Sequence, residues 1–423
     1  MTMERMIRGL LGTLLVATAV SAETPAASGS RKLAWTTQSS AAREGLLELQ
    51  RRIESYQVGP VGQALGRKIV EADPEFALGE YYLSAILPAG EAQQHLDRAV
   101  QLASKASDGE RRFVEALVLA RGQNPQAGLE PLEKLSREFP DERPLHMLLG
   151  QLYATLNRIE QAESAYRRAM AIDDSTPRAR TLLGACHTLK GDYAQARAIF
   201  EGALATMPEG AAPVAIRYGI ALTHLYQDNP EAAVASLETS LAEYRKSEAS
   251  AAFPEVFLWN AIARIHLENG RPEQAIAAYE KGYASVPGSN LPEDQKQLWL
   301  GRLHHGRGRA LARMGRHDEA WQAVTTVKAM IDEGGEKAQQ YLTAYHYLAG
   351  YVKLEAGDLA AAVEHLRQSD QTDPFQKLLL ARAWERQGES AKAQTGYQEI
   401  LQSTGNNLDR ALAFSEAKRK AAR

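Results

Sequence analysis

A set of small and aromatic residues recurs in this 423-residue chain at a constant distance of 34 positions. The first copy has Leu149, Gly150 and Tyr153 followed by Ala162, Tyr166 and Ala169, and the second has Leu183, Gly184 and His187 followed by Ala196, Phe200 and Ala203. One offset relates every member of the set, so the two segments are expected to fold as copies of one unit. Since a single unit of this size cannot bury its apolar face alone, the copies must stack on one another.

The spacings within each copy are those of α-helices. Residues three, four and seven positions apart lie on one face of a helix, and small residues such as Gly150 and Ala162 let two helices approach to about 8–10 Å. Gly191-Asp192 and Gly357-Asp358 suit the turns between helices. Prolines lack the backbone N–H and are predicted to stop the second helix of each pair, at Pro74, Pro140, Pro208, Pro287 and Pro374.

The pattern Leu-Gly-x-x-Tyr, followed by Ala-x-x-x-Tyr or Phe, resembles the tetratricopeptide repeat, a helix-turn-helix unit of about 34 residues. Fainter copies are centred on Gly62, Ala92, Ala127, Ala233, Ala275, Ala320, Ala362 and Ala393. The resemblance implies an all-α fold, an α-solenoid in which about eight to ten units form a right-handed superhelix over residues 41–405, with a C-terminal capping helix at 406–423. Wider spacing of the copies between about 233 and 362 predicts longer helices or loops there. The register between 287 and 345 stays open, because Arg307 occupies a place that is usually apolar.

The first 22 residues have the pattern of an export signal. Arg5 and Arg8 precede an apolar run from Leu10 to Val20, and Val20-Ser21-Ala22 offers small residues for cleavage. The run is shorter than the roughly 20 apolar residues that span a bilayer, so a signal peptide cleaved near Ala22 is favoured over an uncleaved anchor. We therefore expect a bacterial protein that is periplasmic or secreted, with a flexible leader at residues 23–40 and no integral membrane span.

Composition narrows the function classes. The net charge of −3 provides no overall attraction to nucleic acid. The single cysteine, Cys186, excludes an intrachain disulfide, and it is expected to be a core thiol two residues after Gly184. No His-Glu-x-x-His motif is present, and Gly306-Arg307-Gly308 is an incomplete glycine pattern inside a helical repeat. The sequence therefore predicts no enzyme, no cofactor, no metal site and no nucleic-acid partner.

One basic segment has a candidate function. Between Lys296 and His317 there are six Lys or Arg residues, three His and no acid. With Gly308 taken as the close-packed small residue, the resemblance implies that the residues facing the concave groove are Asn260, Arg264, His305, Arg309, Arg313, Tyr347, Tyr351, Arg382 and Arg386. Guanidinium groups bind carboxylates in a bidentate manner, so this groove would suit an acidic peptide. The alternative is a solvated face whose arginines pair with acids of neighbouring repeats.

The resemblance implies a function in binding rather than in catalysis. The leading hypothesis is a non-enzymatic scaffold that binds a protein or peptide in the periplasm. The alternative is a structural assembly subunit of an envelope export machine for polysaccharide, pilus or outer-membrane assembly, and an enzyme with a site in the groove is less favoured. The sequence identifies neither the partner nor the oligomeric state.

Overall fold

The computed structural model describes residues 31–122, 124–247 and 249–422. The predicted signal peptide and residues 23–30 of the predicted leader lie outside the described residues. The chain divides into two compact units, residues 1–219 and 220–423, and each is described by itself. In the described ranges every regular element is a helix and none is a strand, which confirms the predicted all-α class of stacked repeats.

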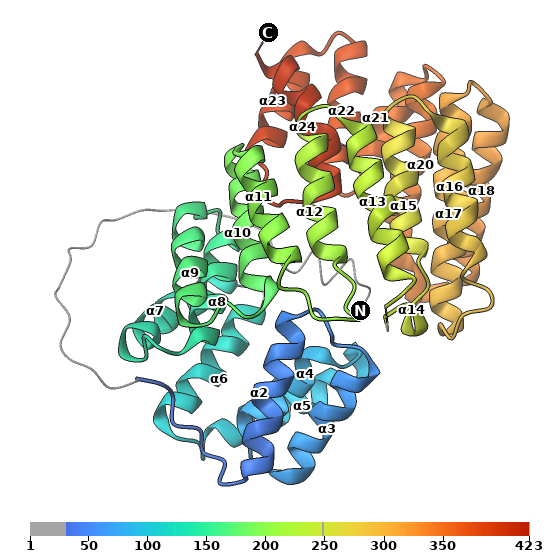
Figure 1. Ribbon diagram of the computed structural model, residues 1–423. Helices are drawn as coiled ribbons and strands as arrows, with labels where there is room; N and C mark the ends of the chain where they lie inside the picture. Colours follow the sequence, from blue (N-terminus) through green and yellow to red (C-terminus); the bar gives the residue numbers. More distant parts are fainter. Residues whose placement is uncertain (1–30, 123, 248, 423) are drawn as a thin grey trace. The chain divides into compact units, whose positions relative to one another are not determined.

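Unit 1 is built from antiparallel helix pairs that stack in chain order (Figure 1). Its helices are α2 (Ser40–Glu54), α3 (Pro60–Ala72), α4 (Ala77–Ile86), α5 (Ala89–Ala103), α6 (Asp108–Arg121), the 3-10 turn η1 (Pro125–Gly128), α7 (Leu129–Glu138), α8 (Arg143–Thr155), α9 (Ile159–Ile172), α10 (Pro177–Lys190) and α11 (Tyr193–Leu204). The helix α12 (Val214–Leu225) crosses the division between the units.

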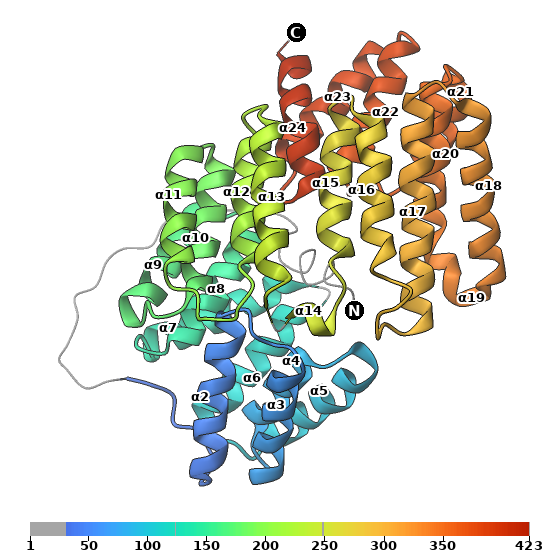
Figure 2. The same cartoon turned by 45° about the vertical axis from the view of Figure 1, so that its right-hand side comes forward.

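Unit 2 repeats the same arrangement, and its helices stand side by side in Figure 2. They are α13 (Pro230–Tyr244), α14 (Ala249–Ala252), α15 (Val256–Glu268), α16 (Pro272–Ala284), α17 (Glu293–Arg313), α18 (His317–Glu333), α19 (Gly335–Ala338), the 3-10 turn η2 (Gln339–Tyr341), α20 (Leu342–Glu355), α21 (Leu359–Arg367), α22 (Pro374–Arg386), α23 (Ser390–Gln402) and α24 (Leu408–Ala421). The last helix, α24, packs against α22 and α23 and also reaches α15.

The small residues of the repeat lie where the first helix of a pair meets an aromatic ring of the second. A Cβ placed on Gly150 would lie 2.4 Å from Cε1 of Tyr166, and one on Gly184 would lie 2.7 Å from Cε1 of Phe200. Real Cβ atoms do not approach so closely, so these two positions require glycine for the helices to cross at this distance. The rings of Tyr166 and Phe200 are fully buried as a result.

The wider spacing predicted between about 233 and 362 arises in part from the segment with α14 between α13 and α15, and in part from longer helices. Helix α17 has 21 residues and α18 has 17. A Cβ on Gly308 would lie 3.0 Å from Cβ of Ala323 in α18, so Gly308 faces its own second helix, as the proposed register requires. Arg307 is exposed and pairs with Glu280, and therefore occupies no apolar place.

One proline prediction is wrong in detail. Pro74, Pro140, Pro208 and Pro287 follow the ends of second helices, as expected. Pro374 instead occupies the first position of α22, seven residues after the end of α21. The first turn of a helix tolerates proline because its N–H would have no partner within the helix, so Pro374 begins a helix rather than ending one.

Candidate functional site

All nine predicted groove residues lie on four first helices of unit 2, namely α15, α17, α20 and α22. The structure brings four of them into direct contact. Arg309 is buried, and its Nη1 donates a hydrogen bond to the Tyr347 hydroxyl at 2.8 Å. Arg313, one turn later on α17, donates from Nε to the Tyr351 hydroxyl at 2.8 Å. Residues four apart share a helical face, which is why both guanidinium groups meet the tyrosines of α20.

A carboxylate that the sequence reasoning missed lies between these two arginines. Glu268, at the end of α15, is only 4% exposed; one oxygen lies 3.0 Å from Nη2 of Arg313 and the other lies 3.7 Å from Nη1 of Arg309. The Tyr351 hydroxyl is 3.3 Å from the same carboxylate. A buried charge requires such partners, since an isolated ion loses its hydration without compensation. Glu268 lies outside the acid-free basic segment, so the composition of that segment could not reveal it.

A second carboxylate also reaches Arg313. Glu355, the last residue of α20, lies 3.1 Å from Nε of Arg313. Tyr279 of α16 accepts a hydrogen bond from Nη2 of Arg309 at 3.0 Å, although the sequence pattern assigned this tyrosine to packing alone. The four predicted residues therefore belong to a largely buried network of phenols, guanidinium groups and carboxylates rather than to a row of free cations.

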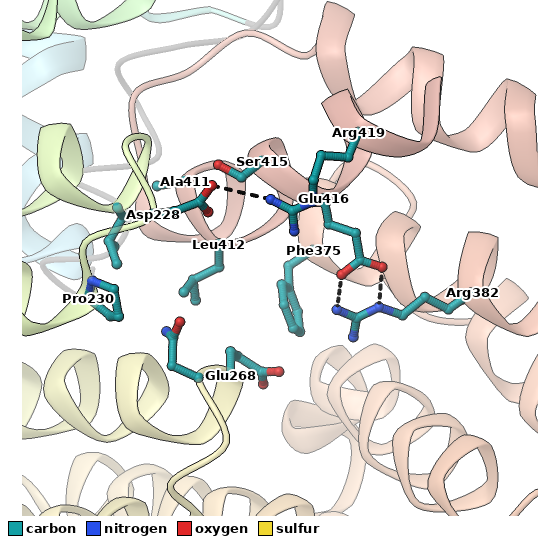
Figure 3. Close-up of a pocket in the computed structure, with 12 residues that line it drawn as sticks. Asp228, Pro230, Glu268, Phe375, Arg382, Ala411, Leu412, Ser415, Glu416 and Arg419 are labelled. Atoms are coloured by element: carbon teal, nitrogen blue, oxygen red, sulfur yellow. Dashed lines mark hydrogen bonds and ion pairs between the residues drawn. The ribbon is translucent and has the colours of Figure 1, made fainter. Parts of the chain in front are cut away.

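The C-terminal helix α24 supplies acids to two further predicted residues. Asp409 forms an ion pair with Arg264. Glu416 accepts from Nε and Nη2 of Arg382 at 2.9 and 2.5 Å, in the bidentate geometry that arginine favours with carboxylates. Figure 3 shows this fork, with the Glu416 carboxylate facing the Arg382 guanidinium. The predicted groove residues Arg264 and Arg382 are thus paired with a helix of the same chain. That helix carries two acids, Asp409 and Glu416, among four Lys or Arg residues.

Helix α24 is also anchored by a cation of its own. Arg410 is buried and donates to the Tyr226 hydroxyl at 3.0 Å and to the Ser403 carbonyl at 3.0 Å. Its guanidinium lies 4.6 Å from the centre of the Phe414 ring. Since Ala413 and Ala417 are fully buried as well, α24 is packed on several sides rather than resting on a surface.

The remaining three predicted residues are engaged within the protein. Asn260 donates to the Val256 carbonyl of its own helix at 2.9 Å, and Arg386 donates to the Leu354 carbonyl at 2.6 Å. Nε2 of His305 lies 3.0 Å from the Ala344 carbonyl oxygen. Burial, reinforced by the nearby Arg309 cation, holds the pKa of His305 well below its usual range, so His305 is neutral at pH 7 and donates from Nε2.

Of the two alternatives for the basic segment, the pairing of its arginines with acids of neighbouring elements describes Arg309 and Arg313 in this structure. Some donors are left over: Nε and Nη2 of Arg264 and Nε of Arg309 are buried and meet no hydrogen-bond acceptor among the described residues. A partner that binds at these arginines would have to replace α24 or join it.

A cavity of about 110 Å³ opens beside α24 in unit 2 (Figure 3). Its wall is mostly charged or polar and includes Asp228, Glu268, Arg382, Glu416 and Arg419. Acids and bases alternate around it, and Arg419 pairs with Asp228 at 3.2 Å. In the described ranges no three or more His, Cys, Asp or Glu side chains gather closely enough to hold a metal ion. No helix in the described part of the chain has the length and apolar character needed to cross a membrane.

Comparison with protein families finds tetratricopeptide repeats at residues 118–186, 176–246 and 218–290, and at 298–321 together with 343–368. These matches cover more than half of the chain, which belongs to the tetratricopeptide-repeat family. Members of this family are generally non-catalytic scaffolds. A comparison with curated proteins finds no match.

Several solved structures are similar to the chain. PilW, a type IV pilus biogenesis factor, shares 18% identity at a TM-score of 0.41, over 55% of this chain and 97% of PilW. A tetratricopeptide repeat protein from Parabacteroides merdae shares 17% identity at a TM-score of 0.39, over 62% of this chain and 98% of that protein. Human IFIT1, in its dimer with m7Gppp-AAAA, shares 15% identity at a TM-score of 0.43, over 87% of this chain and 91% of IFIT1.

Proposed function

We propose that this chain is a non-enzymatic protein-binding scaffold of the periplasm, and that the predicted groove of unit 2 recognises a helical segment that presents carboxylates on one face. The observation that carries the proposal is the position of α24, whose Asp409 and Glu416 carboxylates pair with Arg264 and Arg382. Helix α24 is held at these residues by charge and by apolar packing. A partner helix with acids seven positions apart presents the same two charges, because positions seven apart lie on one helical face.

The unpartnered donors of Arg264 and Arg309 support the same interpretation. A buried donor without an acceptor costs about 1–3 kcal/mol, so a ligand that brings additional carboxylates gains affinity from satisfying these groups. Charge-assisted hydrogen bonds are the strong ones in proteins, which favours an acidic segment over a neutral one.

Cross-linking in intact cells tests the binding role. A photo-reactive amino acid replaces Asn269, an exposed residue that lines the cavity beside α24, and in a matched control replaces Gln322, an exposed residue of α18. We expect adducts from the position-269 variant, with cross-linked partner peptides rich in Asp and Glu, and none from the position-322 variant. Absence of adducts at position 269 in a folded protein would contradict the proposal. Recovery of one stable multi-protein envelope complex would instead favour the assembly role.

Export is tested separately. The support for it is the sequence of residues 1–22, which combines a basic start, a short apolar run and small residues near Ala22. Amino-terminal sequencing of the protein from a periplasmic fraction is expected to begin near Glu23. An intact Met1 on the exported protein, or stable attachment to the membrane, would refute cleavage at this place.

A further inference from the structure

Residues 31–39 of unit 1 differ from the flexible leader that the sequence predicts. They lie in an extended conformation, and Leu33 and Thr37 are buried while Arg31, Lys32 and Ala34 are exposed. Alternation of buried and exposed side chains is the signature of an extended segment that rests on a surface. Figure 1 shows this segment passing α6 before the chain enters α2. We call it the N-terminal segment.

The surface beneath it is an edge of unit 1, formed by the residues at the amino-terminal ends of three successive first helices. Phe76 precedes α4, Ser107 precedes α6 and Glu142 precedes α8. The N-terminal segment crosses these ends in reverse order, from α8 to α4. We call the surface the helix-start edge.

Carboxylates of the helix-start edge hold backbone amides of the N-terminal segment. The N–H of Arg31 donates to Asp141 at 3.0 Å, that of Leu33 to Glu142 at 3.1 Å and that of Thr36 to Glu110 at 2.5 Å. Amide hydrogen bonds to carboxylates are charge-assisted and stronger than those to neutral acceptors. These hydrogen bonds involve only backbone N–H groups of the segment, so any extended segment without proline at the positions of Arg31, Leu33 and Thr36 can form them.

Side chains add selectivity along the same edge. Ser107 donates from its hydroxyl to the Ala34 carbonyl at 2.5 Å, and its N–H donates to the Thr36 hydroxyl at 2.7 Å. The side chain of Leu33 lies over Gly109, where a Cβ would come within 2.7 Å of it. The Trp35 ring lies 5.9 Å from that of Phe76. An occupant therefore needs an apolar residue at the position of Leu33 and an aromatic one two residues later.

Two of the carboxylates are buried beneath the N-terminal segment. Glu110 is fully buried and Glu142 is 7% exposed. Burial raises the pKa of both side chains, and the hydrogen bonds from Thr36 to Glu110 and from Leu33 to Glu142 act in the opposite direction. The segment itself contributes to this burial, so on an unoccupied edge water would have to replace the donors of Leu33 and Thr36, while Glu110 would keep the N–H of Leu78 at 3.3 Å. An occupant that supplies the same two donors is therefore favoured.

We propose that the helix-start edge of unit 1 is a peptide-docking site that the N-terminal segment occupies in cis. Its partner in trans is a protein segment of the same chemistry, extended and basic at its start, with an apolar residue followed by an aromatic one. Burial raises the pKa of the Glu142 carboxyl while the charge of Lys32 acts to lower it, and the amide of Arg31 meets Asp141, so a basic start suits these two acids. A tethered segment acts at an effective concentration in the millimolar range, so the partner binds well only when the N-terminal segment is weakened or released. This inference rests on the proposed scaffold function, but it concerns a different unit.

The experiment uses the chain with Leu33→Asp, which disfavours the N-terminal segment while leaving the edge intact. The probe is a fluorescein-labelled peptide with the sequence of residues 30–40, followed by fluorescence anisotropy. We expect at least tenfold tighter binding to the Leu33→Asp variant than to the unaltered chain, where the segment competes. Adding Glu110→Gln should weaken binding at least tenfold, while Asp108→Asn, a change in the same turn at an exposed acid paired with Arg111, should not.

Two results would overturn the proposal: no binding of the peptide to a folded Leu33→Asp variant, or equal binding with Glu110→Gln and Asp108→Asn. If circular dichroism shows that Leu33→Asp fails to fold, a spin label on Gln38→Cys in the otherwise unaltered chain replaces it, since Gln38 is exposed. Millimolar peptide should then mobilise the label, and an unchanged spectrum would refute the site. The assay needs no cellular partner, so its failure would leave the cross-linking result for unit 2 untouched.

Discussion

Replacing Gly184 by alanine tests the close packing of a glycine against an aromatic ring within a helix pair. The added Cβ would lie 2.7, 2.9 and 2.9 Å from three carbons of the Phe200 ring. The ring cannot move aside freely, because a Cβ on Gly219 would lie only 2.5 Å from the same ring. Phe200 is therefore held between two glycines, and accommodation requires the helices α10 and α11 to separate.

The same chain offers a control for the intrinsic effect of the substitution. Gly202 lies within α11, and the nearest atom to its Cβ would be Cδ of Arg180 at 4.0 Å, which is ordinary contact. Glycine to alanine in a helix gains up to about 1 kcal/mol from backbone entropy, and this term is common to both sites. Overpacking costs about 1–3 kcal/mol, so the free energies of unfolding of Gly184→Ala and Gly202→Ala should differ by about that amount, with Gly184→Ala the less stable.

Urea unfolding followed by circular dichroism at 222 nm measures both variants against the unaltered protein. Gly184→Leu should be more destabilised than Gly184→Ala, because it places more atoms against Phe200. The double change Gly184→Ala with Phe200→Leu should recover part of the loss, since a smaller side chain makes room for the new Cβ. Equal free energies of unfolding for Gly184→Ala and Gly202→Ala would refute the assignment of the close crossing.

Three further predictions follow from buried groups. Burial raises the pKa of the Cys186 thiol to about 12. At pH 8, iodoacetamide should therefore label Cys186 at least about 100-fold more slowly in the folded protein than in the urea-unfolded protein, as measured by mass spectrometry. Equal labelling rates would contradict a core position for Cys186. Glu268→Gln should lower the free energy of unfolding in urea by about 3 kcal/mol. This is near the lower end for breaking a buried ion pair, because Arg313 still has the Glu355 carboxylate. An unaltered urea midpoint would show that the pair contributes nothing to stability. Burial and the neighbouring Asp409 raise the pKa of Asp373. The folded state therefore binds the proton of Asp373 more tightly than the unfolded state does. The resulting stabilisation of the folded state is present at low pH and is lost as pH rises through the raised pKa. Asp373→Asn, which keeps a helix-capping acceptor, should flatten that loss between pH 4 and 8, and an unchanged pH profile of unfolding would argue against it.

Features that depend on contacts over short distances could be predicted from the sequence. The 34-residue recurrence and the placement of helices depend on residues within one pair, as the close contacts of Gly150 with Tyr166 and of Gly184 with Phe200 illustrate. Such contacts repeat with the period of the chain, so a pattern along the sequence can reveal them. The same reasoning identified which face of α17 carries Arg309 and Arg313, because offsets from Gly308 count positions on a single helix.

The partners of those helix faces depend on the tertiary arrangement and could not be predicted from local patterns. Arg264 pairs with an acid 145 positions later, and the amide of Leu33 meets a carboxylate 109 positions later. The partner of each residue depends on small rotations between successive pairs that accumulate along a solenoid. No local pattern encodes that sum, and a segment that reads as flexible or merely capping can therefore become an occupant of the protein's own surface. This is why the basic residues of α17 were visible in the sequence, while the acids that neutralise them were not.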